Sequence, residues 1–287
     1  MIIHSMPELP EVETFARSLE RALRGRRVAS VRLLFRPLLR TGSPALLSRL
    51  RGRKVECVGR RGKYLLIRFE GGLSLAFHLK MTGGFQFVPK GTSPEKHARL
   101  VFTFRGATPD LHFRDTRKFA RLYALPTEAE AEFPSIAALG PEPLEVGLED
   151  FARLIRRRKG RLKSLLLNQA FLAGVGNIYA DESLFRARLH PLRKASTLSR
   201  GEAERLLASI QAVLRKAIAR GGSSIRDYSD SEGRRGSYQE SHRVYGREGE
   251  PCPGCEGLIV RKVIGGRASF FCPKCQKKGH LPLAIGH

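Results

Sequence analysis

Apolar residues near the start of the chain recur at intervals of three and four, the spacing of one face of a helix. They are Val12, Phe15, Ala16, Leu19 and Leu23. Pro10 fits the first turn of such a helix, because its missing N–H would have no partner there. The sequence therefore predicts one amphipathic helix at the beginning of the fold.

The residues that follow have the pattern of β-strands. Stretches rich in aliphatic, β-branched and aromatic residues lie at 63–70, 73–79, 98–104 and 111–125. Gly71 and Gly72 separate the first two stretches, which predicts a hairpin. One helix followed by several strands predicts a β-rich N-terminal domain.

The pattern becomes helical beyond 122–152, an acidic, proline-rich segment without lysine or arginine that we interpret as a linker. Amphipathic stretches lie at 149–159, 162–171, 177–188 and 201–220. The last of them stops at the pair Gly221-Gly222. The turn at 172–176, with Asn177 as the cap of the next helix, predicts a helix-turn-helix. Residues 223–241, rich in Gly, Ser, Asp and Arg, predict a long flexible loop, and such loops are usually functional or disordered.

The net charge of the chain indicates what kind of partner it binds. Lys and Arg number 52 and Asp and Glu 27, so the formal net charge is +25. A charge of this size favours a polyanionic partner, with nucleic acid first and an anionic membrane surface second. Hydrophobic residues make up 41% of the chain, which is enough for a core and argues against general disorder. We expect no membrane span and no secretion signal, because no apolar run is long enough and the start lacks a basic and apolar leader.

Four of the five cysteines form two closely spaced pairs near the C-terminus. They are Cys252, Cys255, Cys272 and Cys275. In a chain without a secretion signal, such pairs indicate a metal site rather than disulfides, and four thiolates close the shell of one structural Zn²⁺. The segment 256–271 between the pairs fits a β-hairpin with Gly265-Gly266 as its turn. Cys57 stands alone, and we expect it to be a small buried residue.

Two carboxylates, Glu8 and Glu11, follow Pro7 within the segment Met-Pro-Glu-Leu-Pro-Glu-Val-Glu at 6–13. By pattern alone they are acids at a helix start, where the helix dipole favours negative charge. However, the segment 7–13, the turn Gly-Val-Gly-Asn-Ile-Tyr at 174–179 and the cysteine unit occur in this order. From about Met6 to Gln276, this set closely resembles the formamidopyrimidine-DNA glycosylase and endonuclease VIII family.

The resemblance implies an α+β multidomain fold. Its parts would be an N-terminal catalytic β-sandwich domain with one helix at 1–135, a helix–two-turn–helix domain at 136–244 and a zinc-finger β-hairpin with a short tail at 245–287. The loop at 223–241 would recognise the lesion. These expectations agree with the helix, strand and cysteine patterns of the chain.

The resemblance also implies a bifunctional enzyme of base excision repair. Such an enzyme excises an oxidised base through a Schiff base and then cleaves the strand at the abasic site by β,δ-elimination. The segments 221–228, 236–239 and 244–247 are similar to the branch that removes oxidised purines, 8-oxoguanine and formamidopyrimidines. The partner would be double-stranded DNA containing oxidised bases or abasic sites. We expect a monomer in the bacterial cytoplasm, associated with the nucleoid.

Residue roles follow from the same resemblance. Pro7 matches the nucleophile, whose secondary amine becomes the N-terminus once Met6 is removed. Glu8 matches the acid/base, Glu11 a supporting carboxylate and Lys63 a phosphate contact or proton-transfer aid. Met81, Arg117 and Phe119 match the trio that fills the gap left by a flipped base. We also expect His78, three residues before Met81, to contact the DNA. Contacts to the DNA backbone match Lys163, Asn177, Tyr245 and Arg267, and Arg267 also joins the catalytic group.

Several of these residues have simpler interpretations. Met81 and Phe119, taken alone, fit a hydrophobic core, and Lys63 fits an exposed strand. Asn177 is a good plain helix cap, and Arg267 fits solvated charge on a hairpin.

The chain departs from the family pattern at residues 1–5. If they persist, the nitrogen of Pro7 is a tertiary amide without a lone pair for attack, so we expect translation to start at Met6. A catalytically silent DNA-binding protein is the alternative if 1–5 are retained. An endonuclease VIII-like enzyme for oxidised pyrimidines is a second alternative, and a zinc-ribbon transcription or RNA-binding factor a third. Ala120 also stands where the family often has glycine.

Overall fold

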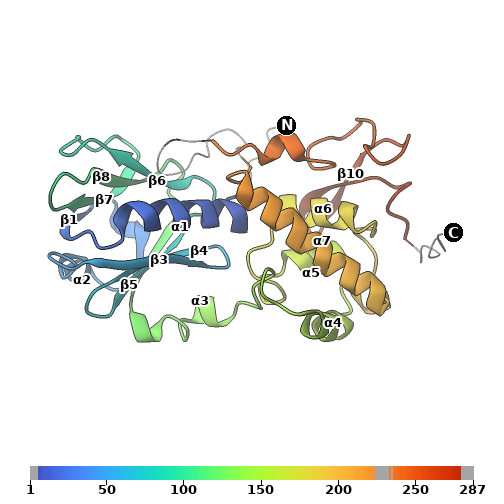
Figure 1. The fold of residues 1–287 in the computed structure, drawn as a ribbon, viewed down its shortest axis with the longest axis horizontal. Coiled ribbons are helices and arrows are strands. Elements are labelled where there is room, and N and C mark those ends of the chain that lie inside the picture. Colours follow the sequence, from blue (N-terminus) through green and yellow to red (C-terminus); the bar gives the residue numbers. More distant parts are fainter. Residues whose placement is uncertain (1–5, 224–232, 234, 279–287) are drawn as a thin grey trace. The chain divides into compact units, whose positions relative to one another are not determined.

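The computed structural model describes residues 6–223, 233 and 235–278 (Figure 1). The chain divides into two compact units. The first lies within Ile2–Ala138 and Ala217–Gln239, and the second within Leu139–Lys216 and Glu240–His287. Most of the predicted loop at 223–241 lies outside the described residues.

The first unit is a β-sandwich with a long helix, α1 (Leu9–Leu23). Its strands are β1 Val28–Leu33, β2 Leu39–Thr41, β3 Val55–Arg61, β4 Tyr64–Phe69, β5 Leu73–His78, β6 Gly83–Val88, β7 Ala98–Phe104, β8 Asp110–Asp115 and β9 Arg121–Pro126. One sheet has the order β1-β7-β8-β6 and the other β2-β9-β5-β4-β3. Short helices are η1 Arg36–Leu38, α2 Pro44–Ser48, η2 Thr127–Ala129 and α3 Pro134–Ala137.

A single apolar core joins α1 to both sheets. Phe15 of α1 lies edge-on to Phe85 of β6, and Phe85 contacts both Phe77 of β5 and Phe113 of β8. All four rings are nearly or fully buried. The apolar face predicted for the first helix therefore packs into the core that it shares with both sheets. The core thereby fixes the position of the helix start, where Glu8 and Glu11 lie.

The predicted strands are confirmed in part. β4 and β5 form the expected hairpin across Gly71 and Gly72, which both have positive φ, and β7 spans the predicted 98–104. The single strand predicted at 111–125 is wrong, because the segment contains β8 and β9, which belong to different sheets. Arg and Gly interrupt the apolar pattern of β1, β3 and β6, and sequence analysis missed these strands for that reason.

The second unit contains α4 Leu148–Arg156, α5 Leu162–Leu167, α6 Asn177–Arg186 and most of α7 Arg200–Ala219, with the short helices η3 Ala195–Thr197 and, at its edge, η4 Tyr238–Ser241. The helical stretches predicted after the linker are thus confirmed, with earlier ends for α4, α5 and α6. Gly176 is the N-cap of α6 and Asn177 its first helical residue, so the predicted cap is wrong. Within the described part of the chain, no helix has the length and apolar character needed to cross a membrane.

The acidic segment at 122–152 is more than a linker. Its first part forms β9, η2 and α3, and Glu130 is buried in an ion pair of 2.6 Å with Arg68 of β4. The Nη1 atom of Arg68 also lies 3.6 Å from the sulfur of Cys57. Cys57 is half-buried on β3, so the expectation of a buried residue is wrong. Part of the acidic charge therefore neutralises an arginine of the sandwich.

The C-terminal strands β10 Val260–Ile264 and β11 Arg267–Phe271 form the predicted hairpin. Ile264 pairs with Arg267 across Gly265 and Gly266, whose φ values of 57° and 73° suit a tight hairpin turn. The α+β fold with a sandwich, a helical part and a zinc-finger hairpin is thereby confirmed.

Candidate functional site

The start of α1 forms a compact acidic centre next to Pro7. Glu8 is the N-cap of a capping box, in which the carboxylate of Glu8 accepts from the backbone N–H of Glu11 and the carboxylate of Glu11 accepts from that of Glu8. The backbone N–H of Glu8 donates to Glu11 Oε2 at 2.9 Å. Both carboxylates are at most 3% exposed, and Pro7 is half-buried. This local structure brings two buried carboxylates to the residue predicted to be the nucleophile.

Lys63 and His78 lie at one end of the second sheet. Lys63 occupies the tight turn between β3 and β4 and is only 6% exposed. Its neighbour Tyr64 pairs with His78 of β5, and the two rings meet edge to face at 5.0 Å. The predicted exposed-strand alternative for Lys63 is therefore wrong.

His78 is a neutral imidazole. Burial, together with the positive charges of Lys80, Lys63 and Arg121, lowers its pKa to about 3. Its Nδ1 accepts a hydrogen bond from the backbone N–H of Lys80 at 3.2 Å, so the ring proton resides on Nε2. His78 can therefore contact a phosphate or sugar oxygen as a hydrogen-bond donor, without carrying charge.

Met81, Arg117 and Phe119, which come from two loops, form a surface cluster that we call the exposed cluster. Arg117 and Phe119 are exposed, and Met81 is half-buried. Arg117 Nη1 lies 3.0 Å from the sulfur of Met81, and its guanidinium lies 4.8 Å from the centre of the Phe119 ring. Phe119 is 50% exposed, which argues against the core interpretation. The structure thus brings together an apolar surface and a guanidinium, the combination that could replace an extruded base.

Asp115 joins the two loops of this cluster through hydrogen bonds, and the sequence analysis did not identify it. Its buried carboxylate accepts hydrogen bonds from Thr82 on one loop and from the backbone N–H groups of Arg117 and Ala120 on the other. A single aspartate at a strand end carries no sequence signal for this role, because the role depends on a contact between segments 33 residues apart.

A second group of predicted residues lies in the second unit, around the start of α6. The amide nitrogen of Asn177 donates to the carbonyl of Ala268 on β11 at 2.8 Å, which joins α6 to the hairpin. Arg267, the first residue of β11, is exposed at the hairpin tip. The structure therefore brings Asn177 and Arg267 to neighbouring positions on this unit.

The predicted contact of Lys163 with DNA is wrong for this structure. Its side chain is fully buried, and its ammonium donates to Asp181 Oδ1 at 2.7 Å and to the carbonyl of Asn177 at 2.9 Å. The other oxygen of Asp181 accepts from the backbone N–H of Phe270 at 3.0 Å. Lys163 therefore orients the start of α6 instead of reaching solvent.

Glu182 performs a similar task for the segment that carries Tyr245. It accepts hydrogen bonds from the backbone N–H groups of Arg243, Val244 and Tyr245, at 2.9 to 3.0 Å. Tyr245 is buried, with its ring edge against Phe270, and its predicted DNA contact stays a prediction. The two adjacent acids at 181–182, within the largely apolar stretch 178–185, are the sequence signal that could have indicated buried anchors.

The four cysteines of the second unit fit one zinc ion. All four sulfurs lie within 4.8 Å of one another, with Cys252 and Cys275 at 3.8 Å and Cys255 and Cys272 at 3.5 Å. A tetrahedron with Zn–S bonds of about 2.3 Å separates its sulfurs by about 3.8 Å. The closed set of thiolates supplies a structural site, in which the ion would stabilise the hairpin that carries Arg267.

We expect removal of zinc to abolish specific DNA binding. Structural zinc contributes about 10–16 kcal/mol in small zinc domains, so the hairpin should unfold in Cys272→Ser and lose the position of Arg267. Zinc content by atomic absorption and affinity for DNA containing an abasic-site analogue check this expectation. Cys57→Ser is the matched control and should retain both. Full affinity in a zinc-free protein would contradict the structural role.

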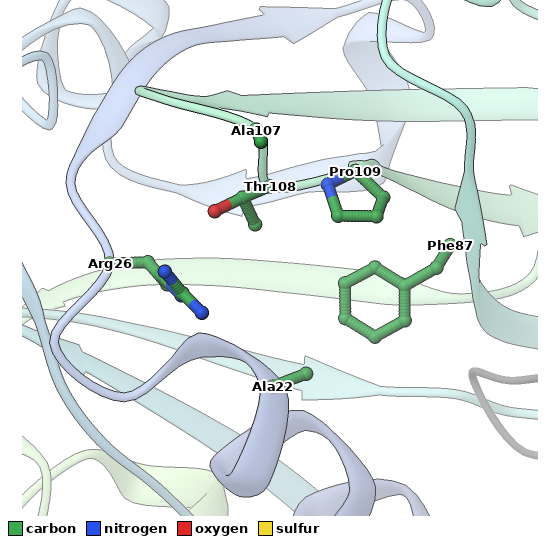
Figure 2. Close-up of a pocket in the computed structure, with 6 residues that line it drawn as sticks. All are labelled: Ala22, Arg26, Phe87, Ala107, Thr108 and Pro109. Carbon is green, nitrogen blue, oxygen red and sulfur yellow. The ribbon is translucent and has the colours of Figure 1, made fainter.

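A separate pocket of about 450 Å³ lies elsewhere in the first unit (Figure 2). Its lining residues are Ala22, Arg26, Phe87, Ala107, Thr108 and Pro109. Ala22 is near the end of α1, about 20 Å along the helix from Glu8. None of the predicted site residues lines this pocket.

Family models match most of the chain. Residues 6–122 match the formamidopyrimidine-DNA glycosylase N-terminal domain, 139–229 the H2TH domain of the same enzymes, and 249–278 a zinc finger found in FPG and IleRS. The formamidopyrimidine-DNA glycosylase of Solibacter usitatus is 50% identical over 275 residues, which cover 95% of this chain and 100% of that relative.

Solved structures agree with these matches. A variant of the Lactococcus lactis enzyme in complex with DNA containing Fapy-dG is similar with a TM-score of 0.89 and 35% identity, over 95% of this chain and 100% of that one. Lactococcus lactis Fpg in complex with DNA containing an abasic site gives a TM-score of 0.88 and 36% identity, over 94% and 100% of the two chains.

Proposed function

Because this chain belongs to the formamidopyrimidine-DNA glycosylase family, we propose that it excises oxidised purines from double-stranded DNA and then cleaves the strand at the resulting abasic site. The substrates of the first step are 8-oxoguanine and formamidopyrimidines. The observation that carries the proposal is the pair of buried carboxylates, Glu8 and Glu11, directly after Pro7. Similar proteins bound to Fapy-dG and abasic-site DNA support the substrate class.

The chemistry begins with the secondary amine of Pro7 as the chain's N-terminus. The amine attacks C1′ of the damaged nucleoside, a new N–C1′ bond forms, and the glycosidic bond breaks as the base leaves with a proton. Glu8 donates a proton to the sugar oxygen as the ring opens, which leaves an iminium at C1′. Loss of the C2′ proton and then of the C4′ proton expels the 3′ and 5′ phosphates in turn. Hydrolysis of the iminium then releases the amine.

Base extrusion needs a substitute for the lost stacking, and the Met81–Arg117–Phe119 cluster supplies one. Met81 and Phe119 provide apolar surface, and the guanidinium of Arg117 provides donors for the orphaned base. Lys63 and His78 would contact phosphates near the acidic centre, and Asn177, Tyr245 and Arg267 would contact phosphates from the second unit. One structural Zn²⁺ maintains the hairpin that carries Arg267.

A comparison of substrates tests the proposal. We expect release of 8-oxoguanine from a duplex with cytosine opposite, and much slower release of thymine glycol. The reverse preference would favour an endonuclease VIII-like activity on oxidised pyrimidines. Tight binding to both duplexes without release would favour the catalytically silent alternative.

We further propose that the protein acts as a monomer on the bacterial nucleoid. We keep the domain limits predicted from the sequence, which lie between residues 135 and 136 and between residues 244 and 245.

Replacement of Arg267 should weaken DNA binding without loss of zinc. Arg267 is exposed and has no acidic partner among the residues that the structure describes, so its charge is available for a phosphate. In Arg267→Ala we expect the slope of log K against log salt concentration to fall by about 0.9, the value for one phosphate contact. Lys262→Ala removes another exposed charge from the same hairpin and serves as the control. Equal slopes in the two variants would exclude a specific phosphate contact.

A further inference from the structure

A second contact of Glu11 links the acidic centre to a segment far along the chain. Glu11 Oε2 accepts the N–H of Glu8 at 2.9 Å, and its Oε1 accepts the N–H of Ser223 at 2.7 Å. Glu11 and Ser223 are 3% and 5% exposed, so both hydrogen bonds are shielded from water. One carboxylate therefore joins the backbone next to Pro7 to a residue 212 positions away.

Gly222 makes this contact possible. Its φ is +80°, a left-handed conformation that side chains rarely adopt. A Cβ atom at this position would lie 2.7 Å from Glu11 Oε1 and 3.0 Å from its Cγ. Only glycine allows the backbone to approach the carboxylate this closely.

The chain returns to the same point after the residues that the structure leaves undescribed. Tyr238 donates its N–H to the carbonyl of Gly222 at 3.0 Å, and Ser237 donates to that of Arg220 at 2.9 Å. A Cβ atom on Gly236 would lie 2.3 Å from the carbonyl oxygen of Gly222 and 2.4 Å from that of Gly221. Both roots of the predicted lesion-recognition loop are therefore held together, and one of them is held on Glu11.

We propose that Glu11 is a positioning residue that aligns both roots of the 223–241 segment with the Pro7 nucleophile through Ser223 and Gly222. We name the contacts among Glu11, Gly222, Ser223, Gly236 and Tyr238 the root clasp. The inference rests on the proposed function, in which residues 223–241 recognise the damaged base. Release of a base requires the amine, Glu8 and that segment, whereas cleavage of a preformed abasic site requires the amine and Glu8 but not that segment. The root clasp should therefore affect base release selectively.

Gly236→Ala separates this role from general destabilisation. Its Cβ would collide with two carbonyl oxygens, while Gly201→Ala, at the start of α7, places a Cβ in open space and is the matched control. We expect Gly236→Ala to slow release of 8-oxoguanine by about tenfold or more, with cleavage of a preformed abasic site changed by less than about twofold. Equal rates of 8-oxoguanine release in Gly236→Ala and Gly201→Ala would overturn the proposal, as would an equal loss of both activities in Gly236→Ala.

Hydrogen–deuterium exchange tests the contacts without reference to activity. In Glu11→Gln, one of the two N–H donors must lose its acceptor, because an amide has only one oxygen. We expect faster exchange in peptides that report the amides of Ser223 and Tyr238, and the same increase in Gly236→Ala. Unchanged exchange at Tyr238 in Glu11→Gln would overturn the proposal. If the unaltered protein released no 8-oxoguanine, the proposed function would fail, but the exchange result would still decide whether the root clasp exists.

Discussion

A chain that begins at Pro7 should be trapped by borohydride on DNA containing 8-oxoguanine, whereas a chain that retains residues 1–6 should not. In the first form Pro7 carries a secondary amine, and in the second its nitrogen is an amide whose lone pair is delocalised. Loss of a covalent nucleophile should lower the rate of base release by at least about a thousandfold. The family model begins its match at residue 6, which supports a start at Met6.

Peptide mass spectrometry of the trapped complex identifies the attached residue. We expect the added mass on the N-terminal peptide that begins at Pro7. The two forms should bind DNA containing an abasic-site analogue with similar affinity, which is the control for folding. An adduct on Lys63 in the extended form would show that another amine can act, and it would contradict the assignment of Pro7.

Glu8→Gln should slow both base release and strand cleavage by about 10²–10⁴-fold, the usual contribution of a general acid or base. The glutamine oxygen can still accept the N–H of Glu11, so the capping box and the start of α1 should persist. Single-turnover rates on 8-oxoguanine and abasic-site duplexes measure the loss. Because Glu8 is buried and adjacent to Pro7, no other described residue is placed as well to supply this proton.

Glu56→Gln is the control for Glu8→Gln, because Glu56 is an exposed acid on β3 of the same unit. It should leave both rates unchanged. A rate in Glu8→Gln within about threefold of that of the unaltered protein would exclude Glu8 as the general acid. In that case Glu11 would be the remaining buried carboxylate at the start of α1.

Local patterns predicted the parts of the fold that depend on neighbouring residues. The spacing of apolar residues was enough for α1, the double glycine for the β4–β5 hairpin, and the cysteine spacing for the zinc unit. Strands β1 and β3 were missed, because each buries only part of its length and carries arginine among its apolar residues. Their identity depends on pairing with β7 and β4, which the local sequence does not contain.

The candidate site also contains residues that local motifs predict and residues whose role depends on distant contacts. Motif matching predicted roles for Pro7, Glu8 and the members of the exposed cluster. It could not distinguish a lysine that contacts DNA from one that is buried. A lysine at position 163 fits either role by residue type, and only the buried ion pair with Asp181 shows that its side chain points into the protein. The sequence also contains no indication of Asp115, because its role depends on hydrogen bonds that join two loops distant in the sequence.

Two lysines beside the exposed cluster carry a conformational cost. Lys80 and Lys118 have φ values of +54° and +61°, and a left-handed conformation costs a non-glycine residue about 1–2 kcal/mol. Glycine at either position would make the protein more stable and would remove a cation beside the cluster that we propose to face the orphaned base. Selection for heat resistance alone would therefore favour glycine, and thermostabilised variants of this enzyme should gain melting temperature at the expense of their search for damage.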